Sequence, residues 1–114
     1  MNKRAEALAT RLEQGVFELA DYAEGLTPQQ WAAAVAEDGR SVGIVLHHVA
    51  TMYPLEMELA QTIVNGQAIA GVTWDVVAQI NAHHASEHAE PERGETLTLL
   101  RQNSSAAAAA VRTM

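Results

Sequence analysis

The sequence has no cysteine, only 4% aromatic residues and no long apolar run. The lack of cysteine excludes disulfide bonds, thiolate metal ligands and a cysteine nucleophile. The apolar segments fall short of the roughly 18 residues that a membrane-spanning helix requires. Basic residues are also scarce, because 7 Lys and Arg stand against 14 Asp and Glu, for a net charge of −7. This balance argues against nucleic acid and against an anionic membrane as partners.

The length of 114 residues suffices for one compact domain, so residues 1–114 are taken as a single unit. Apolar residues make up 48% of the chain, which excludes a disordered protein. Alanine, leucine, valine and isoleucine dominate them, and this composition favours helices over sheets. The basic N-terminus lacks the apolar stretch of a signal peptide, because Glu6, Arg11 and Glu13 interrupt it. We therefore expect a cytoplasmic protein.

Apolar residues recur at spacings of three and four along most of the chain, which is typical of amphipathic helices. Thr27, Ser41 and Thr73 each stand where a side chain can cap the start of a helix. The pattern predicts helices over the ranges 2–24, 31–37, 42–64, 74–89 and 95–114. The predicted fold class is therefore all-α, a helical bundle of four long helices and one short one. Trp31 and Trp74 are expected to act as packing anchors near the starts of two helices.

The five histidines are the most informative residues of the chain. His48 shares a helical row with Val45 and Met52, so we expect it to face the interior of the bundle, with His47 toward the flank. An inward-facing histidine needs a polar partner, since burial of an unpaired polar group is costly. That partner is either a metal ion, for which imidazole is a common ligand, or a hydrogen-bonding group on a neighbouring helix.

The remaining histidines stand close together, at the end of the predicted helix 74–89. His84 and His88 are four residues apart, the spacing by which one helix face chelates a metal ion. The alternative is an exposed last turn, where a protonated imidazole suits the helix dipole. No serine has the sequence setting of an activated nucleophile, so no catalytic residue is identified. The candidate metal ligands are therefore His48, His84 and His88.

Two segments resemble the DinB-like superfamily of small helical-bundle proteins. The segment SVGIVLHHVATMYPLEMELAQ (41–61) is similar to its first metal-ligand helix, and residues 73–114 are similar to its later elements. The resemblance implies a four-helix bundle that holds a divalent metal, zinc or nickel, with three histidines. His48 matches the first of these ligands. The other two form an H-x-x-x-H motif on the family's last helix, which has no match in residues 1–114, so the resemblance gives no role to His84 and His88.

The resemblance implies a metal-dependent enzyme that uses a small-molecule thiol, such as mycothiol or bacillithiol, as an S-transferase or isomerase. The alternative is a non-catalytic helical module for dimerisation or small-ligand binding, with a lost or incomplete metal site. A bundle without its last helix exposes an apolar groove, so we expect a homodimer. If the chain binds a metal, His48→Ala is expected to abolish binding and His47→Ala to have little effect.

Overall fold

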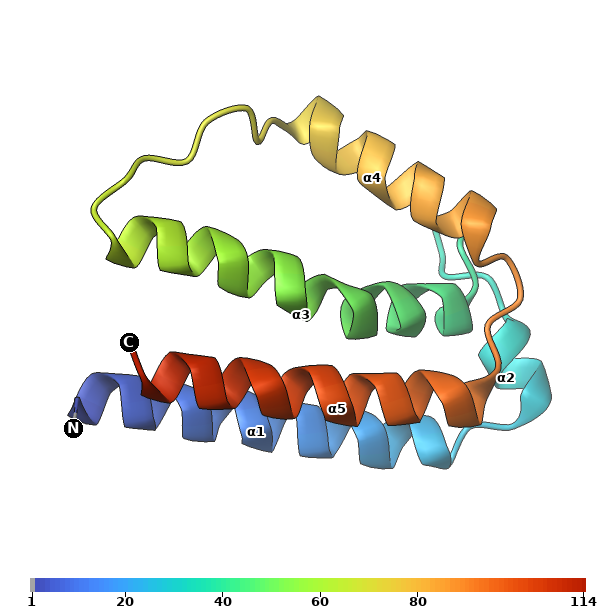
Figure 1. Cartoon of the computed structure of the whole chain (residues 1–114). Helices are drawn as coiled ribbons and strands as arrows, with labels where there is room; N and C mark the ends of the chain where they lie inside the picture. The colour runs from blue at the N-terminus through green and yellow to red at the C-terminus, as the bar shows by residue number, and fades with distance from the viewer. Residues whose placement is uncertain (1) are drawn as a thin grey trace.

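The computed structural model describes residues 2–114, which form five helices joined by loops (Figure 1). The helices are α1 (Lys3–Glu24), α2 (Pro28–Ala32), α3 (Val42–Val64), α4 (Trp74–Glu87) and α5 (Arg93–Arg112). The only β-type pairing among the described residues is an isolated bridge between Ala34 and Ser41. The predicted all-α class is confirmed.

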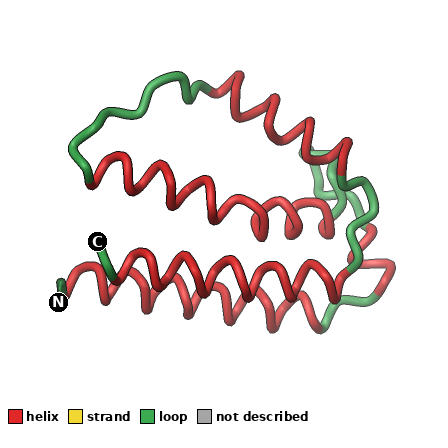
Figure 2. The backbone as a smooth tube through the Cα atoms, in the orientation of Figure 1, coloured by secondary structure: helices red, strands yellow, loops and turns green. Residues whose placement is uncertain are grey.

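The helices are arranged in layers around α5. Helix α5 packs against both α1 and α3, while α4 lies over α3 as an outer layer (Figure 1). Helices α1 and α5 run in opposite directions, so both chain ends lie at the same end of the molecule. Figure 2 shows that a long loop joins α3 to α4, which then runs back along α3. The C-terminal part of α4 thereby reaches the N-terminal part of α3.

The core between α1, α3 and α5 is built largely from alanine and leucine. Ala9 and Ala23 of α1 and Ala108 of α5 have no exposed surface, and Leu100 is 1% exposed. Small side chains let helix backbones approach closely, and this is the role of the alanine run 106–110 in the sequence. The amide of Asn103 adds one polar contact, because its Nδ2 donates a hydrogen bond to the carbonyl of Ala50 at 2.8 Å.

The helix starts follow the capping signals of the sequence. The side chains of Thr27, Ser41 and Thr73 each accept a hydrogen bond from a backbone N–H in the first turn of α2, α3 and α4. The prediction of a short helix over 31–37 was wrong, since α2 ends at Ala32. The chain turns back after that point, with Glu37 in the left-handed region at φ 68°.

Trp31 of α2 packs against the start of α3. Its Nε1 donates a hydrogen bond to the carbonyl of Pro91 at 2.8 Å, in the loop before α5. The indole covers Gly43 so closely that a Cβ atom there would lie 2.4 Å from Nε1. Trp31 is therefore the packing anchor that the sequence predicted. Trp74 is not, because it is 88% exposed.

Candidate metal centre

Four histidine rings meet where the first turns of α3 face the last turns of α4. Helix α3 supplies His47 and His48, and α4 supplies His84, with His88 as its C-terminal cap. Nδ1 of His47 and Nε2 of His84 are 2.8 Å apart and share a hydrogen bond. The ring of His88 lies beside both, with centroids 4.4 Å from His47 and 5.0 Å from His84.

Three of these histidines can reach a common point. His47, His84 and His88 each place one ring nitrogen so that all three atoms lie within 4.8 Å of one another. The structure thus brings together the predicted pair, His84 and His88, and adds His47, which the sequence analysis had placed toward the flank. His48 is not part of this group of three, and its role as a ligand stays a prediction.

The helical row used in the sequence analysis did not identify which histidine of α3 meets α4. The buried residues of α3 are Gly43, Leu46 and Ala50, on the side that packs toward the core. Both histidines are half-buried, but His47, four residues after Gly43, adjoins this row, whereas His48 lies toward the other side of the helix. The feature of the sequence that could have identified His47 is the adjacent pair His47–His48, because either member of such a pair can contact histidines of another helix.

Burial favours the neutral form of three of these imidazoles, those of His47, His48 and His84. His84 is 7% exposed, and burial together with the neighbouring His48 and His47 lowers its pKa to about 4. Burial lowers the pKa of His47, and the nearby His88 lowers it further. Burial also lowers the pKa of His48, and the positive charge of Arg40 adds to the shift. A metal ligand must be a neutral imidazole, so protons do not compete for His47 and His84 at neutral pH.

The group of three fits a borderline transition metal. Imidazole nitrogens suit zinc, nickel, copper and ferrous iron, and the chain has no thiolate that would favour a softer ion. Three protein ligands leave one tetrahedral position open, as in catalytic zinc sites. Two ligands of one zinc ion lie about 3.3 Å apart, given bond lengths of about 2.0–2.1 Å. Binding would therefore move the rings of His47 and His84 apart by about half an ångström and replace their hydrogen bond.

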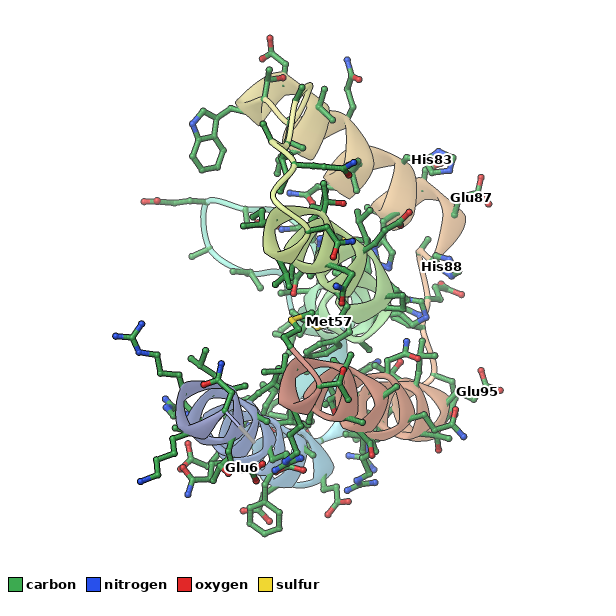
Figure 3. All side chains as sticks on the ribbon, turned by 60° about the vertical axis from the view of Figure 1, so that its left-hand side comes forward. Glu6, Met57, His83, Glu87, His88 and Glu95 are labelled. Atoms are coloured by element: carbon green, nitrogen blue, oxygen red, sulfur yellow. The ribbon has the colours of Figure 1, made fainter. Side chains whose placement is uncertain are left out.

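Two hollows open on either side of the histidines. One, of about 540 Å³, has apolar side chains of Met52, Val76 and Ile80 in its wall and is also lined by His84 and His88. The other, of about 460 Å³, lies between the end of α4 and α5 and contains His47 and His88. Its polar rim is acidic and consists of Glu87, Glu90, Glu92 and Glu95. Figure 3 shows His83, Glu87 and His88 along the same edge of the molecule as Glu95 of α5.

Three buried polar side-chain atoms of the described residues have no hydrogen-bond partner: Nη1 of Arg40, Nδ1 of His48 and Nδ1 of His84. Buried polar atoms are nearly always paired, so each exception needs an explanation. Two of the three belong to adjacent rings of the histidine cluster. The third belongs to the arginine whose charge acts on those rings.

Comparisons with known proteins add no relative. No family model matches the chain, and no curated protein or solved structure matches it at the significance level applied. The similarity to the DinB-like superfamily therefore remains a prediction from the motifs of the sequence. None of the described helices combines the length and the apolar character needed to cross a membrane.

Proposed function

We propose that this protein binds one divalent transition-metal ion between α3 and α4 and presents it to a small molecule. The observation that carries the proposal is the convergence of His47, His84 and His88, with ligand atoms within 4.8 Å of one another. These side chains come from two helices that are far apart in sequence. The imidazole set suits zinc, nickel, copper and ferrous iron, and of these the family resemblance favours zinc and nickel.

The proposed chemistry is that of a thiol-using transferase or isomerase, as the DinB-like resemblance implies. A bound divalent ion supplies a Lewis acid that lowers the pKa of a coordinated thiol or water. The chain contributes imidazoles as ligands and an apolar wall of Met52, Val76 and Ile80 that can take the carbon skeleton of a small substrate. Glu87 lines both hollows and can exchange a proton with a ligand held there.

Metal titration of the purified protein tests the proposal. Calorimetry with zinc, and the absorption spectrum with cobalt(II), should show one site per chain. Substitution of His47, His84 or His88 by alanine should each weaken binding at least tenfold. His83→Ala is the matched control, since His83 is an exposed histidine of the same helix that lies outside the group of three. Binding that survives His84→Ala unchanged would refute the site.

A second candidate function is a non-catalytic helical module that forms a homodimer. The observation that favours it is a set of exposed apolar residues around the loop between α3 and α4: Ile63, Val64, Val72 and Trp74. Exposed large apolar residues of this kind contribute to interaction surfaces in many proteins when they lie together. Sedimentation equilibrium should then show a concentration-dependent dimer that Trp74→Glu dissociates. A monomer at all concentrations would remove this candidate.

A further inference from the structure

The unpartnered nitrogens of His48 and His84 belong to neighbouring rings. The ring centroids are 4.9 Å apart and the ring planes are inclined by 67°. The hydrogen-bonded rings of His47 and His84 have nearly the same centroid separation, 5.0 Å. The rings of His48 and His84 are therefore at a separation at which an N–H···N bond can form once their nitrogens face each other.

The tautomer of His84 follows from the group that faces each of its nitrogens. A neutral imidazole carries its hydrogen on one nitrogen and a lone pair on the other. Nε2 of His84 lies 2.8 Å from Nδ1 of His47, so Nε2 is the nitrogen of His84 that can share an ion with His47, and a metal there requires the lone pair on Nε2. Nδ1 of His84 must then carry the hydrogen, and its buried position requires an acceptor.

The ring of His48 can be that acceptor. It lies beside the ring of His84, and its own buried Nδ1 has no hydrogen-bond partner. A neutral imidazole keeps a lone pair on one of its two nitrogens, and that nitrogen can accept the bond.

We infer that His48 is a positioning residue of the metal centre, which accepts a hydrogen bond from Nδ1–H of His84 and so directs Nε2 of His84 toward the metal. Ligating histidines commonly donate their second ring N–H to an acceptor that fixes tautomer and orientation. Here the acceptor is another imidazole, on the helix that also supplies the ligand His47. The part that concerns the metal rests on the proposed function, whereas the tautomer of His84 can be observed in the metal-free protein.

The decisive experiment is long-range ¹H–¹⁵N NMR of the histidine rings in the metal-free protein near pH 7.5. We expect His84 to be the Nδ1–H tautomer in the wild type. In His48→Ala it should become a mixture of tautomers. His48→Gln, whose side-chain carbonyl can accept the same bond, should restore the Nδ1–H form. A wild-type His84 that carries its hydrogen on Nε2, or a tautomer that His48→Ala leaves unchanged, would overturn the inference.

Zinc affinity provides the second measurement. Loss of an outer acceptor typically weakens metal binding by about 10–100-fold, so His48→Ala should fall in this range and His48→Gln should recover part of the loss. Complete loss of binding in both variants would make His48 a direct ligand and contradict a positioning role. His83→Ala should leave both the His84 tautomer and the zinc affinity unchanged. If wild-type protein binds no zinc, the proposed function fails, and the NMR result still decides the inference about His84.

Discussion

The α1–α5 pair and the α3–α4 pair differ in what fills the space between their helices. Between α1 and α5 the buried side chains include Ala9, Ala20, Leu100 and Ala108, all of them apolar. His84 is the only buried residue of α4. The apolar residues of α4 that point toward α3, such as Ile80, are only half-buried. Ion pairs of Arg101 and Arg112 with glutamates of α1 lie outside this apolar interior. The interior of one pair is therefore mainly apolar, whereas that of the other contains imidazole rings.

This difference has a consequence for function. Apolar burial stabilises a helix pair whatever the solution conditions, because it involves no titration and no ligand. Contacts between imidazoles depend on pH and on any ion that the rings can bind. The α3–α4 pair is thus the part of the molecule whose stability can respond to a metal. The α1–α5 pair is the scaffold on which that part rests, and each of the following substitutions or conditions tests this division.

The largest expected effect is loss of a leucine from the apolar core. Leu100→Ala should lower the free energy of unfolding by about 2–5 kcal/mol, since it removes a side chain that is only 1% exposed. Ile80→Ala is the matched substitution in α4 and should cost about 1 kcal/mol or less, because that side chain is half-buried. Urea denaturation of both variants measures the difference. Equal losses would show that α4 is held by apolar burial after all.

The next effect is a loss of stability in mild acid. His84 has a pKa of about 4 in the folded protein, against an ordinary value of 6.5 in the unfolded chain. The unfolded state therefore binds the proton first, and stability falls as the pH drops from 6.5 toward 4. For His84 alone this loss amounts to about 3 kcal/mol.

Denaturation curves at several pH values, in wild type and in His84→Gln, measure this linkage. In His84→Gln the free energy of unfolding should depend less steeply on pH between 6.5 and 4. In His83→Gln this pH dependence should equal that of the wild type. A wild-type profile that His84→Gln does not alter would show that another group controls acid stability. His47 and His48 act in the same direction, because burial lowers their pKa as well.

A metal ion should stabilise the folded protein by joining α4 to α3. Zinc at a free concentration of 100 times its dissociation constant should raise the free energy of unfolding by about 2.7 kcal/mol. Hydrogen exchange should show added protection in α4, because the ion opposes its separation from α3. His47→Ala should lack the effect. Protection of α4 that zinc does not raise, or a rise that persists in His47→Ala, would contradict binding at this site.

Much of the fold could be predicted because its signals are local. Helix α3 begins after Ser41 and ends at Val64, as the cap and the glycine after Asn65 indicated. Caps and spacings of three and four residues depend only on near neighbours in sequence. The failure at 33–37 comes from competition between two local structures. That stretch is rich in alanine, yet the backbone N–H of Val35 donates to the carbonyl of Arg40 and closes a turn in place of a helix.

The site could be predicted only in part, since it depends on how two helices are rotated relative to each other. The spacing of His84 and His88 placed both on one face of α4, which is a local property. The choice between His47 and His48 required the position of α4 over α3, and no residue of the sequence specifies it. The row with Met52 implied an interior that the structure places on another side of α3, at Leu46 and Ala50.

The smallest expected effect separates the two tryptophans. Trp31→Phe should lower the free energy of unfolding by about 1 kcal/mol, because it removes the hydrogen bond from Nε1 to the carbonyl of Pro91 and leaves that carbonyl without its donor. Trp74→Phe should change stability by less than about 0.5 kcal/mol, since the side chain is 88% exposed at the start of α4. Denaturation at low protein concentration, where any dimer dissociates, gives both values. A loss in Trp74→Phe as large as that in Trp31→Phe, under the same dilute conditions, would mean that the start of α4 is packed within one chain. The α3–α4 pair would then be held at both ends, and the histidines would no longer be its main attachment.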